Sequence, residues 1–406
     1  TWVSTSMDKI LLLMMASAFK NRRKNMNKKE VFWCKSCLNM STRNRISFDE
    51  KGDCNACQWR DEKQSMDWKP RQKELVDLLD KFRSTNGNFD CIVPVSGGKD
   101  GSYVAYQLKH KYGMNPLTIT IKPALSLEIG DQNLSNFIQS GFNHIHISCN
   151  PLVLDRLNKY GFIEKGFPYY GWLIAITTAV IKTAVNFKIP LIFYGENGEV
   201  EYGGCTQNKD KGLYDLEYMK RVYLEGGHEK VLNRIKADGD ISDADLSFFQ
   251  FPEQEVLSEV GVSFTHWSYY ESWDSYRNYV VAKEKCGLIE KDAGNADTFT
   301  NFSQNDQALY SLHAYLMYLK FGFGRATQDA GIEIRRGAMT RDQAINLVKM
   351  YDNAYPEELI ETFTTYYQMT NDEFDAVLDK YVNKNLFEKR GRVWQPKFDV
   401  AQAFSY

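Results

Sequence analysis

The sequence has few of the features that mark membrane or nucleic-acid-binding proteins. An apolar stretch near its beginning, residues 10–19, is only about half of the ~20 residues that cross a bilayer. Its 50 Lys and Arg residues are balanced by 52 Asp and Glu residues, so it has no general basic field for holding nucleic acid. No internal repeat stands out. We therefore expect neither a membrane span nor a nucleic-acid partner.

The composition is that of a globular protein. With 406 residues, 43% hydrophobic and 25% charged, the chain can form a full core and is expected to contain two or three domains. Residues 1–30 are predicted to be a leader that is partly foreign to the native protein. Four scattered cysteines (Cys91, Cys149, Cys205 and Cys286) indicate a reducing compartment, so we expect the protein to be cytoplasmic.

The other four cysteines form two pairs, Cys34-x2-Cys37 and Cys54-x2-Cys57, within residues 31–62. Two thiolate pairs at this spacing can surround one Zn²⁺ tetrahedrally, as in a zinc ribbon. Four protein ligands leave no open position on the metal, so we predict a structural role. The alternative is a pair of disulfides or redox dithiols, which would suit a sulfur-transfer enzyme.

A phosphate-binding loop is predicted within residues 90–106. An apolar run, residues 91–95, stops at the loop, and a helical pattern begins near Tyr103. Adjacent glycines let the backbone approach an anion, and unpaired N–H groups at the helix start point toward phosphate oxygens. Lys99 supplies a positive charge, and Asp100 a carboxylate suited to Mg²⁺. The predicted phosphate-binding residues are Ser96, Gly97, Gly98, Lys99, Gly101 and Ser102.

Apolar runs alternate with helical patterns over residues 70–211. Further strand-like runs occur at residues 117–121, 144–148 and 191–194. This alternation predicts an α/β fold with a doubly wound parallel sheet that helices cover on both faces. Ligands of such sheets bind beyond the carboxyl ends of the strands, where the predicted phosphate loop lies.

An acidic, glycine-rich segment, residues 194–204, follows the last of these strands. Mutual repulsion makes its carboxylates costly unless cations or donors compensate them. Asp100, Glu196 and Glu199 are the predicted Mg²⁺ ligands, and Asn197 could orient a substrate amide. The alternative is a solvated acidic loop.

The remaining chain is predicted to cover and complete the site. Residues 212–300 are expected to form an insertion or lid, and residues 301–390 a helical C-terminal region. Within the latter, Lys320 and Arg325 make a second anion clamp for pyrophosphate or a sugar nucleotide. Arg335 and Arg336 add two cations. A solvated basic surface is the alternative for all four.

Two resemblances sharpen this interpretation. Residues 96–101 read Ser-Gly-Gly-Lys-Asp-Gly and resemble the SGGKDS pyrophosphate loop (PP-loop) of the N-type ATP pyrophosphatases, with Gly101 where serine is usual. Together with the paired cysteines, residues 194–204 and residues 320–327, this loop resembles the bacterial N-acetyl sugar amidotransferases over about residues 31–394.

The resemblance implies a PP-loop fold and an ATP-dependent reaction that forms AMP and pyrophosphate. An N-acetyl group of a nucleotide-linked sugar would become an acetamidino group, for lipopolysaccharide O-antigen or related surface glycans. It implies ATP, Mg²⁺ and structural Zn²⁺ as cofactors. Ammonia would come from a separate glutaminase subunit, with a cyclase-like companion, because we find no N-terminal catalytic cysteine or other glutaminase constellation in this sequence.

On this interpretation the catalytic residues are Lys99, Asp100, Glu196, Asn197 and Glu199, and the substrate is held by Glu201, Tyr202, Arg335 and Arg336. One rival is a tRNA-thiolating enzyme with the same loop, which would need Cys149 or Cys205 as a sulfur-carrying nucleophile and a basic face for RNA. Another is a non-catalytic zinc-ribbon scaffold whose nucleotide loop has decayed.

Overall fold

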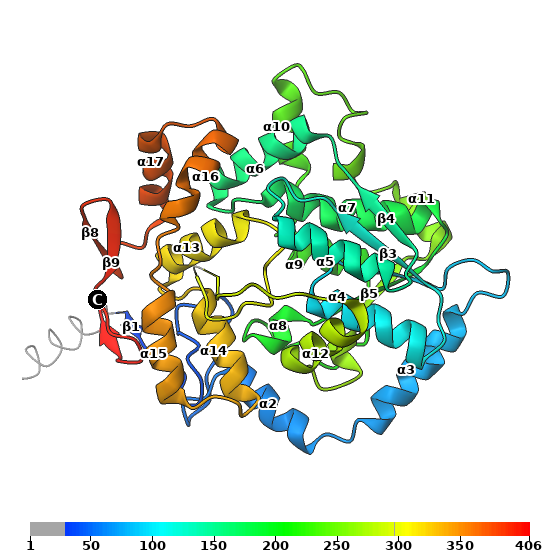
Figure 1. Cartoon of the computed structure of the whole chain (residues 1–406), viewed down its shortest axis with the longest axis horizontal. Coiled ribbons are helices and arrows are strands. Elements are labelled where there is room, and N and C mark those ends of the chain that lie inside the picture. Colours follow the sequence, from blue (N-terminus) through cyan, green and yellow to red (C-terminus); the bar gives the residue numbers. More distant parts are fainter. Residues whose placement is uncertain (1–28, 296) are drawn as a thin grey trace, which may run out of the picture.

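A six-stranded sheet lies at the centre of the computed structural model, which describes residues 29–295 and 297–406 (Figure 1). The strand order is β4-β3-β2-β5-β7-β6, and every neighbouring pair is parallel except β6 with β7. Most of the predicted leader, residues 1–28, lies outside the described residues. The strands are β2 (Cys91–Pro94), β3 (Pro116–Ile121), β4 (His144–Ile147), β5 (Leu191–Tyr194), β6 (Leu213–Tyr214) and β7 (Ser263–His266).

Alternate residues of β2 and β5 face two different cores. On β2, Ile92 packs into the cluster formed by α6 and α7, whereas Cys91 and Val93 pack against α3, α4, α5 and α12. The sheet is therefore covered on both faces, which confirms the predicted doubly wound α/β fold. The helices are α3 (Lys69–Phe82), α4 (Lys99–Tyr106) with a π-turn (Gln107–Lys111), α5 (Glu128–Gln139), α6 (Pro151–Lys165), α7 (Tyr170–Asn186) and α12 (Ser275–Cys286).

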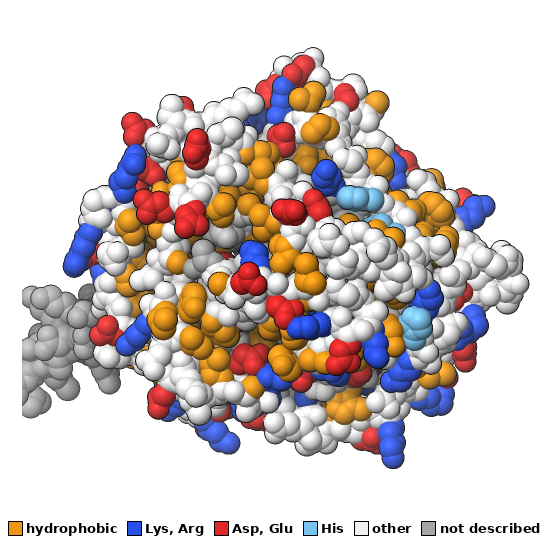
Figure 2. Space-filling view, viewed as in Figure 1, with side chains coloured by type: hydrophobic (Ala, Val, Ile, Leu, Met, Phe, Trp, Pro, Cys, Tyr) orange, Lys and Arg blue, Asp and Glu red, His pale blue; other side chains and the backbone are white. Residues whose placement is uncertain are grey.

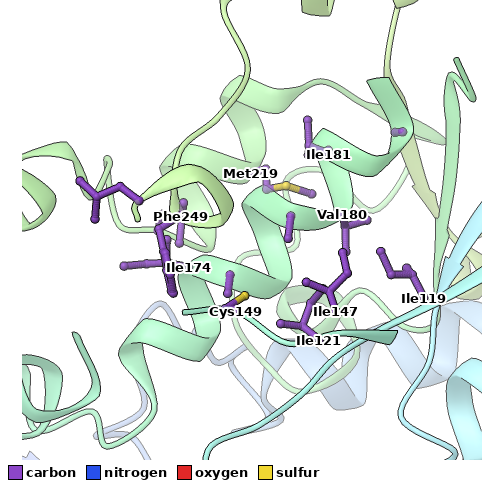
Figure 3. Packing of buried hydrophobic residues seen from close by; sticks show 14 of the residues in the cluster. Ile119, Ile121, Ile147, Cys149, Ile174, Val180, Ile181, Met219 and Phe249 are labelled. Carbon is purple, nitrogen blue, oxygen red and sulfur yellow. The ribbon is translucent and has the colours of Figure 1, made fainter. Parts of the chain in front are cut away.

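The core under α7 is shown in Figure 3. Ile121 and Ile147 of the sheet lie next to Val180 of α7, and Cys149 is buried in the same cluster. Burial raises the pKa of the Cys149 thiol to about 12. A thiol in this environment serves packing and is a poor nucleophile.

Part of the predicted insertion belongs to the central sheet. Strand β7 pairs with β5, and β6 pairs with β7, so these two strands within residues 212–300 belong to the central sheet. The physical reason is that β7 is buried over most of its length and needs a strand partner for its backbone groups. Between β6 and β7 lie α9 (Leu216–Val222), α10 (Glu229–Ala237), a 3₁₀ turn (Ser247–Phe249) and α11 (Gln254–Val260).

The C-terminal region is helical, as predicted. It packs around a second core, which includes Leu316 of α13 and Phe374 of α17 and to which Phe162 of α6 also contributes. Its elements are α13 (Leu309–Phe321), α14 (Arg325–Arg335), α15 (Arg341–Tyr351), α16 (Ile360–Tyr367), α17 (Asn371–Tyr381) and the hairpin β8 (Phe387–Arg390) with β9 (Val393–Pro396). No helix among the described residues is both long and apolar enough to cross a membrane.

The paired cysteines lie in a small unit, residues 30–65, which we call the cysteine unit. It begins with β1 (Glu30–Val31), which pairs antiparallel with β10 (Phe404–Ser405). The second cysteine pair starts α2 (Asn55–Ser65). Between the two cysteine pairs, Phe48 forms an isolated antiparallel bridge with Cys54.

Candidate active site

The loop between β2 and α4 is held tightly by two glycines. Gly97 has a φ of +77°, and a Cβ there would lie 2.3 Å from the backbone nitrogen of Leu134 in α5. Gly101 packs on β2, where a Cβ would lie 2.8 Å from the carbonyl oxygen of Pro94. A serine at this position would require the loop to shift away from β2. Ser102 is fully buried and lines no cavity at the loop, so it does not occupy the predicted phosphate-contacting position.

Two cavities meet at this loop. A polar cavity of about 300 Å³ is lined by loop and C-terminal residues, and an apolar cavity of about 400 Å³ lies at the carboxyl ends of β2, β3 and β5. Ser96, Gly130, Glu196 and Asp306 belong to both. The polar cavity includes Gly98, Lys99, Asp100, Tyr202, Thr300, Asn305, Tyr310 and Arg325, and the apolar cavity includes Val95, Ile119, Ile121, Leu134, Trp172, Ile176 and Val180.

Lys99, Asp100 and Glu196 are brought together at the polar cavity. Lys99 forms an ion pair with Asp100, and the other oxygen of Asp100 accepts a 3.0 Å hydrogen bond from the Asn278 amide. Glu196 accepts a 2.7 Å hydrogen bond from the Tyr202 hydroxyl. Burial and the nearby Asp100 charge raise the pKa of Glu196. A divalent cation between the two carboxylates would offset both effects, so the donor set fits Mg²⁺.

The other carboxylates of the acidic segment point elsewhere. Glu199 pairs with Arg45, whose Nε lies 2.8 Å from its carboxylate. Glu201 accepts hydrogen bonds from Trp59 at 2.9 Å and from Lys63 at 2.6 Å. Neither lines the polar cavity. The segment turns into the short helix α8 (Gly198–Glu201), which directs both side chains toward the cysteine unit. Glu199 therefore lies away from the predicted magnesium position, whereas Glu201 lines a third cavity together with the other predicted substrate-binding residues, Tyr202, Arg335 and Arg336.

Asn197 also has a local structural role. Its carbonyl oxygen accepts a hydrogen bond from the Glu199 N–H at 3.2 Å, and its amide donates to the Tyr214 hydroxyl at 3.2 Å. The side chain caps α8 and lines neither of the two cavities. It therefore does not lie where a substrate amide would meet the phosphate loop.

The four cationic side chains predicted in the C-terminal region do not lie at one site. Arg325 lines the polar cavity and pairs with Asp329 at 2.8 Å. Lys320 instead donates to the carbonyl oxygen of Gly166 at 2.8 Å, away from all three main cavities. Burial lowers the pKa of Lys320 to about 8. Its predicted role in an anion clamp is not supported by this position. Arg335 and Arg336 line a third cavity.

Sequence reasoning missed an irregular polar segment, residues 300–306, that forms one wall of the polar cavity. Thr300, Ser303 and Asn305 offer neutral hydrogen-bonding groups there, and Phe302 an aromatic ring. Asp306 lies where the polar and apolar cavities meet, and burial raises the pKa of its carboxyl group to about 6. The signal in the sequence was a run of polar residues with no helical or strand period just before α13.

The cysteine unit presents a candidate metal centre. The sulfur atoms of Cys34, Cys37, Cys54 and Cys57 lie within 4.8 Å of one another, and all four residues are fully buried. Sulfurs bound to one ion at ~2.3 Å in a tetrahedron stand about 3.8 Å apart, close to the 3.8 Å between Cys34 and Cys57 and the 3.6 Å between Cys37 and Cys54. Backbone N–H groups also donate to the sulfurs, as thiolates require. The arrangement fits a single metal ion.

The metal centre is tied directly to the acidic segment. Asn39 donates to Cys54 at 3.4 Å and to the carbonyl oxygen of Tyr202 at 3.3 Å. Asn55 donates to the carbonyl oxygen of Gly204. The cysteine unit therefore fixes the backbone that carries Glu196 and Tyr202 into the polar cavity.

The fold and the cavities define a general class of protein. It is an α/β protein in which a glycine loop at the carboxyl edge of a parallel sheet lies beside carboxylates and a lysine. Such a site is suited to a phosphorylated ligand and a cation. One more specific finding comes from the C-terminal region. Residues 296–399 match the model of a family described as "LPS biosynthesis protein WbpG-like, C-terminal domain". This segment contains the polar wall at residues 300–306 and all of α13 and α14.

Two further similarities are weaker. A stretch of 124 residues is 29% identical to the uncharacterized protein MJ1599 of Methanocaldococcus jannaschii, and the chain spans only 42% of the length of that relative. The U34-tRNA thiolase NcsA from Methanococcus maripaludis, solved with its 4Fe-4S cluster, aligns over 66% of this chain and 78% of its own with 13% identity. Its TM-score of 0.30 is too low to support a conclusion about this protein.

Proposed function

We propose that this protein is an ATP-dependent amidotransferase that converts an N-acetyl group of a nucleotide-linked sugar into an acetamidino group, in O-antigen or related surface glycan synthesis in the cytoplasm. One observation carries the proposal. The phosphate loop and the segment that matches the WbpG-like LPS biosynthesis domain line the same polar cavity. A nucleotide and a sugar acceptor would meet there.

The apolar cavity suits the nucleoside of ATP. It is lined by aliphatic and aromatic side chains such as Ile119, Trp172 and Val180, and lies beside the phosphate loop. The triphosphate would extend into the polar cavity, against Ser96, Gly98 and the start of α4. Lys99 would offset negative charge as pyrophosphate leaves.

Asp100 and Glu196 would hold Mg²⁺, which when bound supplies charge neutralisation for the phosphates. Among the described residues, the four cysteines form the only compact group of three or more potential ligands, so phosphate oxygens and water would complete the magnesium shell. Asn278 keeps Asp100 oriented by its 3.0 Å hydrogen bond. Zn²⁺ in the cysteine unit would be structural.

The acceptor would lie against the polar wall at residues 300–306. Its amide oxygen attacks the α-phosphorus, the bond to pyrophosphate breaks, and the oxygen carries AMP. Ammonia then attacks the adenylated carbon, gives up a proton, and AMP leaves with the former amide oxygen. The acetamidine remains, and no protein nucleophile is used. Positioning and charge stabilisation would provide most of the acceleration. A glutaminase partner, with a cyclase-like companion, would supply the ammonia.

The thiolase alternative finds little support in the thiols outside the cysteine unit. Cys91, Cys149 and Cys286 are buried, and burial raises the pKa of each thiol above its usual value. Cys205 is partly exposed. On the face shown in Figure 2, basic and acidic side chains are interspersed, with no continuous basic area for RNA.

The test is a direct assay. Purified protein is incubated with ATP, Mg²⁺, ammonium chloride and a panel of UDP-linked N-acetylated sugars, and AMP, pyrophosphate and sugar products are measured by chromatography and mass spectrometry. We expect AMP, pyrophosphate and a product in which NH replaces oxygen, in equal amounts. Replacing ammonium with glutamine should give no product without a glutaminase. Absence of AMP with every acceptor would refute the proposal.

A further inference from the structure

A third cavity, of about 260 Å³, lies between α2, the start of α12 and the end of α14. We call it the basic cavity because four cationic side chains line it, against the two carboxylates of Glu201 and Asp274. The cations are Arg60, Lys63, Arg335 and Arg336. They come from the cysteine unit and from the C-terminal region, so the cavity exists only because these two parts of the chain meet.

Of the residues that the structure describes, three of these four cations have carboxylate partners and one does not. Glu201 is already paired with Lys63 at 2.6 Å. Asp274 uses its Oδ1 as the N-cap of α12, accepting from Tyr276 at 2.9 Å, and lies 3.6 Å from Arg336. Arg60 pairs with the exposed Asp61. Arg336 also pairs with Glu333 at 2.8 Å. Among the described residues, Arg335 is the one cation of this cavity that forms no ion pair with a carboxylate.

Two buried donors at this cavity lack partners among the described residues. They are Nη1 of Arg335 and the indole Nε1 of Trp273, and both residues line the cavity. Arg335 also lies beside the cysteine sulfurs, which take up part of its charge. Buried donors are normally satisfied, so a cavity bordered by two unsatisfied ones and four cations is suited to a ligand rich in acceptors.

The basic cavity is continuous with the proposed reaction site. It shares Tyr202, Ser275 and Ile332 with the polar cavity, which in turn shares Ser96 and Glu196 with the apolar cavity. The three cavities thus form one row. A nucleoside would lie at one end, the phosphates in the middle, and the basic cavity at the far end.

We propose that the basic cavity binds an anionic group of the acceptor, a phosphate or a carboxylate, at a distance from the amide that reacts. This inference rests on the proposed function. Guanidinium groups recognise both anions through paired N–H donors. Anchoring the acceptor at a remote charged group would hold its amide near the α-phosphorus, and the binding energy would be used for positioning.

The test uses Arg336→Gln, which removes one guanidinium that borders the cavity from the surface, where misfolding is least expected. Arg234→Gln on α10 is the matched control, since Arg234 is exposed and lines none of the three cavities. Each protein is first saturated with a non-hydrolysable ATP analogue. UDP and glucuronate are then titrated separately by calorimetry, as probes for a diphosphate and for a carboxylate.

We expect Arg336→Gln to weaken binding of one probe by about tenfold or more, because a hydrogen bond to a charged group contributes roughly 1.5–3 kcal/mol. Binding of the ATP analogue should not change, and Arg234→Gln should behave as wild type. The probe that is affected identifies the anion. Equal binding of both probes by the two variants, or no binding of either probe to wild type, would overturn the inference. Failure of the ATP analogue to bind wild type would instead refute the proposed function.

Discussion

Gly97→Ala should destabilise the protein severely, because two independent costs coincide at this position. A φ of +77° lies in the left-handed region, which costs an L-residue about 1–2 kcal/mol. The added methyl group would also lie 2.3 Å from the nitrogen of Leu134 and 2.5 Å from the carbonyl carbon of Asn133. Forcing such backbone apart costs typically ~1–3 kcal/mol. We expect a total loss of about 2–5 kcal/mol in the free energy of unfolding.

Gly98→Ala is the matched control. Gly98 has a φ of −75°, and the nearest atom to an added Cβ is the flexible Ser96 Oγ at 3.2 Å. Without left-handed strain or a backbone clash, we expect a loss below about 1 kcal/mol. Urea unfolding followed by tryptophan fluorescence measures both variants beside wild type.

The same substitution of Gly97 should affect nucleotide binding. Gly130, Asn133 and Leu134 of α5 border the polar and apolar cavities, so displacement of α5 by the added methyl group would distort both. Calorimetry with ATP and Mg²⁺ should show weaker binding for Gly97→Ala at a temperature where the variant is still folded. If Gly97→Ala and Gly98→Ala unfolded at the same urea concentration and Gly97→Ala bound ATP normally, the described packing of the loop on α5 would be wrong.

Three further predictions concern the site, the metal centre and pH. Lys99→Ala should lower the rate of AMP formation by about a hundredfold or more while leaving the fold intact. Lys111 is exposed, and Lys111→Ala should form AMP at the wild-type rate. Equal rates for the two variants would contradict the assignment of the loop. Cys34→Ser should abolish the binding of a stoichiometric metal ion, measured by mass spectrometry. Cys205→Ser should retain both the metal and turnover. If Cys205→Ser lost turnover while it kept the metal, the thiolation alternative would be favoured. Burial lowers the pKa of His144 to about 4, so the neutral form is favoured in the folded state. The contribution of His144 to stability is therefore lost as the pH falls from about 6.5 to 4. His144→Gln should reduce that loss by about 1–2 kcal/mol, and an identical pH dependence of unfolding in variant and wild type would refute this.

The central strands and the glycine loop after β2 could be predicted from the sequence because local patterns specify them. Strands β2, β3 and β5 are short runs rich in apolar residues, β4 alternates histidine with isoleucine, and helical patterns separate them. Strand β7 escaped prediction because it lies within a segment rich in charged and aromatic residues. Its place in the sheet depends on pairing with β5, a non-local contact that no local pattern encodes.

The candidate site could be predicted only in part, for a similar reason. The spacing of the acidic segment brings Glu196, Glu199 and Glu201 close together in sequence, but their directions depend on partners far away. Arg45 and Lys63, both in the cysteine unit, take up the last two. Only Glu196 remains at the polar cavity. The polar wall at residues 300–306 has no regular period, so its contribution becomes visible only once α13 and α5 are placed in space.

The pairing of β1 with β10 has a consequence for biosynthesis. The cysteines leave the ribosome early, yet the strand that closes their unit and Arg341, which donates to the Cys34 carbonyl at 3.2 Å, are translated much later. Metal captured by the nascent chain would therefore wait, incompletely sheltered, until Arg341 and β10 emerge. The supply of metal and the synthesis of these later segments would together determine when the cysteine unit reaches its finished form.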